Sequence, residues 1–171
     1  MAHTVEHRAR ALLLDGDSLL LMERDRPDRP GIYHITVGGG VEPGDPTLTD
    51  ALHREVREEI GGELEWAVPV HVVVERHPGL VRMQHVFAAR LGAWDFALRS
   101  GPEFDQPSNG RYTPVHVPLT PEAVRATALE PRQLRNFAAE HMDLLRAWTA
   151  SRTAPGSPFP GAPAVSRGGA A

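Results

Sequence analysis

Three closely spaced glutamates, Glu55, Glu58 and Glu59, are the strongest chemical signal in this chain. A helix turns by about 100° per residue, so a helix through this segment places all three carboxylates on one face. Like charges three and four residues apart weaken a helix unless a cation lies between them. Carboxylate oxygens are the ligands that hard divalent cations prefer, so the spacing predicts a site for Mg²⁺, with Mn²⁺ as the alternative. Because Mg²⁺ commonly completes its shell with substrate phosphates, a phosphate-bearing substrate is also indicated.

Arginines in the same segment allow a second interpretation. Arg54 and Arg57 lie among the glutamates, and an Arg54–Glu58 pair at i, i+4 is typical of a solvated helix face. The residues upstream of the segment favour the metal site instead. They form a glycine run, Gly38 to Gly40, that leads through a turn into the helix.

The glycine run and the helix together resemble the Nudix box, whose pattern is G-x5-E-x7-R-E-U-x-E-E-x-G-U, with U an aliphatic residue. Asp45 stands where this pattern has Glu, and the spacer from Asp45 to Arg54 is one residue longer than the pattern. Gly62 occupies the last aliphatic position, and Val37 stands where a proline commonly precedes the glycine pair. The matched positions within Gly39–Gly62 are Gly39, Arg54, Glu55, Val56, Glu58, Glu59 and Gly61.

The resemblance implies a role for each chemically active residue of the box. Glu58 and Glu59 would be the principal metal ligands, and the carbonyl of Gly38 would complete the shell. Glu55 would be a further metal ligand or the base that activates water. Arg54 would orient the glutamates for catalysis.

Two further groups outside the box are candidates for the site. In several subfamilies of the family that the box resembles, a carboxylate on a later loop supplies the base or another ligand, and Glu103 is the candidate here, with Asp105 beside it. An ordinary polar loop is the other interpretation of this segment. Arg24, at the end of a predicted strand, is the candidate for contacting a substrate phosphate.

Strands are expected on both sides of the helix in the chain. Asp15-Gly16-Asp17 predicts a hairpin turn between the first two strands. From Thr49 apolar residues recur every four positions, which predicts a helix that ends at Gly61. Pro69 is expected to interrupt a later strand, and residues 92–111 are expected to form a long loop. The predicted strands are Arg10–Leu14, Ser18–Arg24, Tyr33–Val37, Leu64–Arg76, Met83–Leu91 and Tyr112–Val117.

Two helices are predicted near the end of the chain, a short one from Thr120 to about Leu129 and a longer one from Pro131 to Trp148. With the resemblance, this order of elements implies an α/β (α+β) fold, an α/β/α sandwich with a mixed β-sheet. Residues 1–152 are expected to form one domain. Residues 153–171, rich in Pro, Gly and Ala, are expected to be a disordered tail.

Composition excludes several classes of protein. The 171 residues are 41% hydrophobic and 23% charged, which is typical of a globular domain. Cysteine is absent, which removes thiolate nucleophiles, disulfides and cysteine-ligated metals. Lysine is also absent, which excludes Schiff-base catalysis. The net charge of −4 argues against a nucleic-acid partner, and no apolar stretch reaches the length of about 18 residues that a membrane span needs.

The glutamates and the metal that they predict indicate hydrolysis of a phosphoanhydride bond. The resemblance implies a metal-dependent hydrolase that cleaves this bond in a nucleoside diphosphate linked to another moiety. The alternative is a module of the same fold that binds or senses a ligand without turnover. Isomerisation of a prenyl diphosphate, which relatives of this fold perform, is discounted because its catalytic cysteine has no counterpart here. No secretory signal is visible, so a cytoplasmic location is expected, and family analogy suggests a homodimer.

Overall fold

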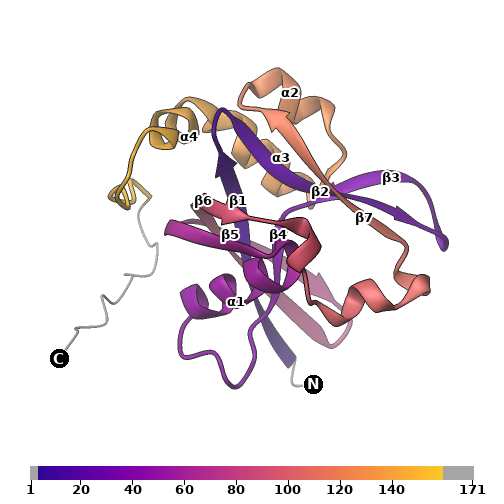
Figure 1. Cartoon of the computed structure of the whole chain (residues 1–171). Helices are drawn as coiled ribbons and strands as arrows, with labels where there is room; N and C mark the ends of the chain where they lie inside the picture. The colour runs from indigo at the N-terminus through magenta and orange to yellow at the C-terminus, as the bar shows by residue number, and fades with distance from the viewer. Residues whose placement is uncertain (1–3, 160–171) are drawn as a thin grey trace.

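The computed structural model describes residues 4–159, apart from the side chain of Glu103, and it contains a mixed eight-stranded sheet (Figure 1). The strand order is β5-β6-β1-β2-β3-β8, with β4 on β1 and β7 on β2. The β1–β6 and β3–β8 pairs are parallel and the other pairs are antiparallel. The strands are β1 (Thr4–Asp15), β2 (Ser18–Arg26), β3 (Arg29–Ile35), β4 (Val37–Gly40), β5 (Gly62–His77), β6 (Leu80–Trp94), β7 (Arg111–Pro118) and β8 (Leu129–Glu130).

The sheet splits along one edge of β1, and this split positions the site described below. The end of β1 pairs with β2 from Leu13 onward, whereas its earlier residues, Arg8 to Ala11, pair with the short strand β4. β4 therefore leaves the main sheet with the glycine run on it. The helix α1 (Leu48–Ile60) follows directly after this strand and its turn.

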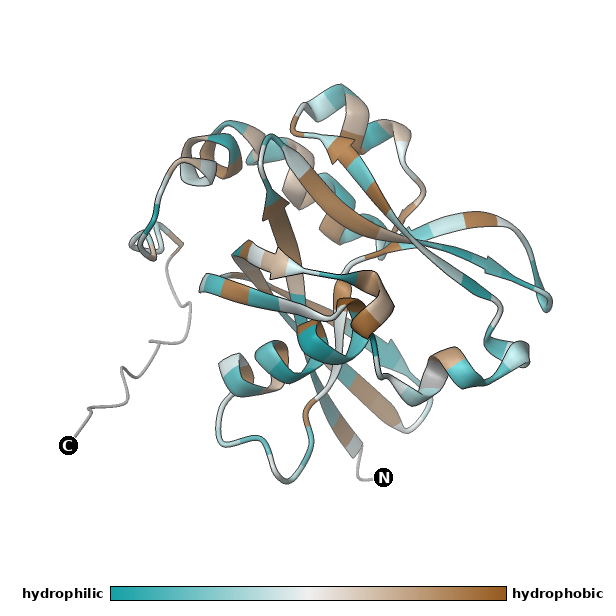
Figure 2. Ribbon diagram, viewed as in Figure 1, coloured by the Kyte–Doolittle hydropathy of each residue, from teal (hydrophilic) through white to brown (hydrophobic). Residues whose placement is uncertain are grey.

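Helices cover both faces of the sheet, as the α/β/α expectation requires (Figure 1). One core cluster joins Leu13 and Leu20 to the apolar stripe of α1. The other joins Leu12 and Leu19 to helices α2 (Pro121–Ala126), α3 (Arg132–Glu140) and α4 (Met142–Thr149). Adjacent residues thus serve opposite cores, because side chains alternate along a strand. Figure 2 shows the hydrophobic residues gathered in the strands and on the helix faces turned toward them. No helix within residues 4–159 is long and apolar enough to cross a membrane.

Two expectations about individual elements are wrong. Pro69 does not interrupt its strand: β5 runs through it with a register shift between Pro69 and His71, which an edge strand tolerates because one side needs no backbone partner. The long helix predicted from Pro131 is two helices that meet at His141, whose ψ of 19° departs from helical geometry. The bend lets α4 follow the core, where Trp148 meets Trp66 edge-on at 6.3 Å between ring centroids.

The predicted loop over residues 92–111 has local structure. β6 extends to Trp94, and three short 3₁₀ helices follow, η1 (Phe96–Leu98), η2 (Pro102–Asp105) and η3 (Pro107–Asn109). This segment is anchored to the end of α1, because the backbone N–H groups of Ser100 and Gly101 donate to the carbonyl of Glu58 at 2.8 and 3.0 Å. The loop therefore lies beside the glutamate-bearing helix.

The expected boundary near residue 152 stays a prediction, and residues 160–171 lie outside the described part of the chain. Residues 153–159 contain no helix or strand, yet they contact the domain. The Ser157 hydroxyl donates to the carbonyl of Pro69 at 3.0 Å, and the Phe159 ring lies 5.4 Å from that of Phe137 between centroids. Phe159 is thus packed against the core that α3 covers.

Truncation tests whether this contact stabilises the domain. Deleting all residues after Arg152 removes the partly buried Phe159 ring, and we expect a loss of about 1 kcal/mol of folding free energy, or roughly 2–4 °C in Tm. Differential scanning calorimetry would measure it. A shorter deletion that begins after Phe159 is the control, and identical Tm values for the two truncated chains would show that the contact contributes nothing.

Candidate active site

The local sequence of α1 determines which way its glutamates point. Thr47 caps the first turn by accepting from the backbone N–H of Asp50 at 3.1 Å, and Gly61 ends the helix in the left-handed conformation at φ 60°. Leu52, Val56 and Ile60 are fully buried against the sheet. With that stripe fixed, Glu55 and Glu59 on the neighbouring face of the helix are directed toward β4.

The glycine run on β4 lies directly against these carboxylates. The backbone N–H of Gly38 donates to Oε2 of Glu59 at 2.8 Å. A Cβ at Gly39 would lie 2.5 Å from Oε1 of Glu55, so only a residue without a side chain admits the carboxylate there. The structure thus brings Gly38, Glu55 and Glu59 together from two elements of the predicted site.

Arg54 binds the glutamates and the loop that precedes them. Its Nη1 donates to Oε1 of Glu55 at 2.9 Å and to Oε2 of Glu58 at 3.0 Å. Its Nη2 donates to the carbonyl of Gly40 at 2.8 Å. Its Nε and Nη2 also grip both oxygens of Asp45, at 3.1 and 2.9 Å. These bonds, those to Asp45 first, raise the pKa of Arg54, which stays charged and holds two of the predicted ligands in place.

The fold perturbs the ionisation of Glu55. It is buried, and this burial raises the pKa of its carboxyl group, while the hydrogen bond from Arg54 opposes the rise. Glu58 is more accessible, with 34% of its side chain exposed. The two carboxylates therefore differ in environment although both bind one guanidinium, a difference that suits one to proton transfer and the other to metal binding.

The residues present fit a hard divalent cation in their chemistry. The donor set of Glu55, Glu58, Glu59 and the Gly38 carbonyl contains only oxygen, which suits Mg²⁺ or Mn²⁺. Glycine at position 39 also leaves room for a carboxylate at the strand backbone. Within residues 4–159 no three His, Cys, Asp or Glu side chains are already gathered as a metal cluster, and Arg54 lies between two of the glutamates. A cation would therefore have to bind oxygens that Arg54 does not occupy.

Asp45 lies in the loop between β4 and α1, where this chain departs from the box pattern, and it links that loop to the helix. Its side chain is only 7% exposed, and besides its two bonds from Arg54 it accepts from the backbone N–H of Glu42 at 2.8 Å. The hydrogen bonds from Arg54 lower the pKa of the Asp45 carboxyl group. The shorter acid and the longer spacer thus still deliver a carboxylate to the arginine of the box.

This ion pair predicts a pH-dependent stability. A lowered folded-state pKa means that the charged carboxylate stabilises the fold above its ordinary pKa and that this contribution is lost as the pH falls through the lowered value. We expect Asp45→Asn to cost about 2 kcal/mol at pH 7. The difference from the wild type should shrink below about pH 4.

Urea unfolding followed across the acid range would measure this difference. Asp28→Asn is the matched control, because Asp28 also pairs with an arginine, Arg26, at 2.7 Å but is 63% exposed. Exposed ion pairs contribute little to stability because water and salt screen them, so the control should lose little. A loss at Asp45 that stays constant down to the lowest pH would refute the assignment of the stabilisation to its charge.

Arg24 and Glu103 are the two candidate site residues outside the box, and the structure describes the side chain of Arg24 only. Arg24 lies in β2, 6% exposed, with its guanidinium 3.5 Å from the centre of the Tyr112 ring and its Nη2 donating to the carbonyl of Asn109 at 2.6 Å. Among the residues that the structure describes, its buried Nε has no hydrogen-bond partner. Glu103 lies in η2, but its side chain is outside the described residues, so its role stays a prediction.

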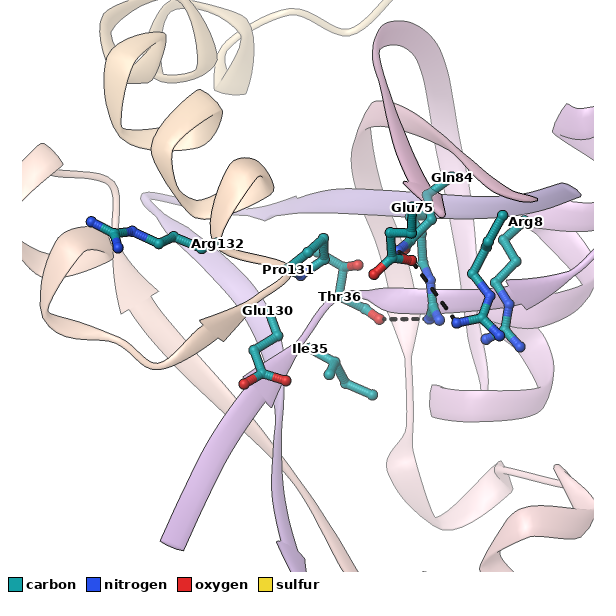
Figure 3. A pocket seen from close by; sticks show the side chains of 10 residues that line it. Arg8, Ile35, Thr36, Glu75, Gln84, Glu130, Pro131 and Arg132 are labelled. Carbon is teal, nitrogen blue, oxygen red and sulfur yellow. Dashed lines mark hydrogen bonds and ion pairs between the residues drawn. The ribbon is translucent and has the colours of Figure 1, made fainter. Parts of the chain in front are cut away.

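Sequence reasoning missed a basic pocket beside the glycine run (Figure 3). Arg10 on β1 donates to the carbonyl of Thr36 at 3.3 Å and to the carbonyl of Gly38, the residue whose N–H binds Glu59. The alternation of Arg8 and Arg10 around the buried Ala9 was the available signal, because it places both arginines on one face of a strand. The pocket, of about 330 Å³, is lined by Arg8, Arg10, Ile35, Thr36, Glu75, Arg82, Gln84, Glu130, Pro131 and Arg132.

Comparison with known proteins agrees with the resemblance seen in the sequence. The family model described as "NUDIX domain" matches residues 5–135. The nucleoside triphosphatase NudI of Escherichia coli K12 is 51% identical over 51 residues, which are 29% of this chain and 35% of NudI. NudI of Enterobacter sp. strain 638 is 49% identical over 47 residues, 28% of this chain and 32% of the relative. The chain thus matches about a third of the length of these curated relatives.

Solved structures share the fold over most of the chain. The solution structure of the E. coli ORF135 protein has a TM-score of 0.60 at 21% identity, covering 87% of this chain and 96% of that one. A protein described as an ADP compounds hydrolase has a TM-score of 0.61 at 19% identity, covering 85% of this chain and 74% of that one. At these identities the likeness concerns the fold, and the chemistry has to be argued from the residues.

Proposed function

The chain belongs to the NUDIX domain family, and from this premise we propose that it is a divalent-metal-dependent hydrolase that cleaves a phosphoanhydride bond in a nucleoside diphosphate linked to another moiety. The family model and the solved structures support hydrolysis of small nucleotide substrates in general. The substrate class, the metal and the residue roles are our proposals. A cytoplasmic location and a homodimer remain predictions from the sequence.

One observation carries this proposal more than any other. Gly38 binds Glu59, Gly39 admits Glu55 against the backbone, and Arg54 holds Glu55 beside Glu58. Carboxylates from one helix are thereby fixed at a strand end beside a basic pocket. An ion pair network that served stability alone would not require a glycine backbone against a buried carboxylate.

The residues have distinct proposed tasks in this reaction. Glu58, Glu59 and the Gly38 carbonyl would hold the cation, which neutralises charge on the diphosphate and lowers the pKa of a bound water. Glu55, with its pKa raised by burial, would accept a proton from the attacking water. Arg54 would keep both carboxylates in position, and Arg24 and Glu103 stay candidates for substrate contact and for a second base.

A product assay tests the proposal directly. The full chain would be incubated with nucleoside triphosphates, ADP-ribose, dinucleoside polyphosphates and nucleotide sugars, with Mg²⁺, with Mn²⁺ or with EDTA, and the products separated by chromatography. We expect hydrolysis of at least one compound that depends on the added metal. The identity of the products also shows which phosphoanhydride bond is cleaved.

The alternative is a ligand-binding or sensor module of the same fold, and the same panel separates the two. Binding of a nucleotide by calorimetry without any product, across all compounds and both metals, would contradict the hydrolase and support the sensor. Turnover that persists unchanged in EDTA would contradict the metal dependence.

A further inference from the structure

Arg10 binds an oxygen that the proposed reaction assigns to the metal. It lies on β1 opposite Gly38 of β4 in the antiparallel pairing of the two strands. Its Nη1 donates to the carbonyl of Gly38 and, at 3.3 Å, to the carbonyl of Thr36. The Gly38 carbonyl is the neutral member of the proposed ligand set, so a cation of the protein itself is bound where the metal would bind.

The same guanidinium lies in the electric field of the glutamates. Burial lowers the pKa of Arg10, and the negative charge of Glu59 opposes this shift, as does that of Glu55. A guanidinium nevertheless keeps its proton in proteins, so Arg10 contributes a permanent positive charge. This charge adds to that of Arg54, which binds Glu55 and Glu58 from within the helix.

Gly38 connects Arg10 to the glutamates through its backbone. Its N–H donates to Oε2 of Glu59 at 2.8 Å, and its carbonyl accepts from Arg10. The residue is thus held between a carboxylate from α1 and a guanidinium from β1. The direction of the Gly38 carbonyl is therefore fixed by the chain's own charges.

Arg10 and a divalent cation compete for this carbonyl. A carbonyl oxygen has two lone pairs, but if it served both partners at once, their positive charges would meet at one atom. Like charges in a partly buried site repel strongly, because little water screens them. The Gly38 carbonyl therefore binds either Arg10 or the cation.

The structure also offers the released side chain a position. Arg10 lines the pocket of about 330 Å³ described above, and the carboxylate of Glu75 lies in the same wall with Gln84 beside it (Figure 3). A guanidinium that leaves the Gly38 carbonyl can thus stay close to a negative charge without unfolding any strand.

We infer that Arg10 is a positioning residue that occupies the metal site from within: it holds the Gly38 carbonyl in the metal-free protein, leaves that carbonyl when a divalent cation binds, and thereby weakens the affinity for the cation. The inference rests on the proposed function, because that function makes the Gly38 carbonyl a metal ligand. It adds a residue outside the box that sets how much metal the protein needs.

The test compares three variants of the full chain. Arg10→Met removes the charge and keeps an unbranched apolar stem of similar length. Arg10→Lys keeps the charge. Arg8→Met is the matched control, because Arg8 lies on the same face of β1 and carries the same charge, but it pairs with Glu6 at 2.5 Å.

The first measurement is the affinity for Mn²⁺ without any nucleotide, from the electron paramagnetic resonance signal of the free ion. We expect Arg10→Met to bind Mn²⁺ at least about ten-fold more tightly than the wild type, because the site no longer has to release a charged hydrogen bond first. Arg10→Lys and Arg8→Met should stay within about three-fold of the wild type. A residue that only ties β1 to β4 predicts the opposite sign, since losing it would loosen Gly38 and weaken the binding.

The second measurement uses the wild type and so does not depend on the folding of a variant. Nitrogen-15 NMR follows the Arg10 guanidinium, assigned by its absence in Arg10→Lys, while Mg²⁺ is added. We expect its N–H protons to exchange with water faster as the site fills, because the bond to the Gly38 carbonyl is lost. Unchanged exchange at saturating Mg²⁺ would overturn the inference.

The outcomes separate this inference from the proposed function. Equal or weaker Mn²⁺ binding in folded Arg10→Met, together with metal-dependent turnover in the wild type, would overturn the inference and leave the hydrolase standing. Tighter binding in Arg10→Met, in a chain that hydrolyses none of the compounds tested, would support the inference and remove the hydrolase. Absence of metal binding in the wild type and in every variant would overturn both.

Discussion

Glu58→Gln should reduce metal-dependent turnover by roughly a hundred-fold or more, because loss of one charged metal ligand removes about 3 kcal/mol or more of transition-state stabilisation. The fold should survive the change. The amide oxygen of glutamine can still accept from Arg54, and the Ser100–Gly101 segment is attached to the backbone carbonyl of Glu58, which the substitution leaves in place. We therefore expect an unchanged Tm together with a weaker dependence of activity on Mg²⁺.

The measurement is a titration of activity with Mg²⁺ for the wild type and the variant, using whichever compound the panel identifies. Glu63→Gln is the matched control. Glu63 is exposed at the start of β5, so its substitution removes the same charge without affecting Arg54. Activity of Glu58→Gln equal to that of the control at every Mg²⁺ concentration would show that Glu58 is not a ligand, whatever the other glutamates do.

The parts of the site that could be predicted are those encoded locally. Glu55, Glu58 and Arg54 lie within one helix, so helical geometry alone places them on neighbouring positions, and the capping residues that define the helix are adjacent in the chain. The glycine run was recognisable for the same reason. What the pattern could not show is that Gly38 donates to Glu59, since that contact joins two elements through the sheet.

The parts that escaped prediction depend on residues far apart in the sequence. The basic pocket joins Arg8 and Arg10 to Arg82 because β1 and β6 are parallel neighbours, a pairing that no local pattern encodes. The break at His141 and the strand through Pro69 likewise depend on tertiary context, one on the curvature of the core and the other on an edge position. Periodicity predicted the buried faces there but not where the backbone would bend.

Gly38→Ala, which adds one methyl group, should destabilise the fold more than any other glycine-to-alanine substitution near the site. Gly38 has a φ of +130°, which residues with a side chain rarely adopt, and a Cβ there would lie 2.1 Å from the carbonyl oxygen of Ala9. The obstacle is backbone of the central strand β1, which cannot swing aside as a flexible side chain could. We expect a loss of about 3 kcal/mol or more from strain and displacement of β4, which corresponds to roughly 6–12 °C in Tm.

Gly40→Ala is the control that makes this result specific. Gly40 lies on the same strand and its φ is not positive. A Cβ there would meet no atom of the described part of the chain within 4 Å, so the Tm of the variant should stay close to that of the wild type. Thermal unfolding of the three proteins would measure the difference. Activity adds a second comparison, because displacing Gly38 also removes its N–H from Glu59 and its carbonyl from Arg10, whereas Gly40→Ala leaves both contacts intact. Equal Tm values for the two variants would mean that β4 can shift away from β1 without cost. The close pairing of β4 with β1 would then not be what positions the glutamates.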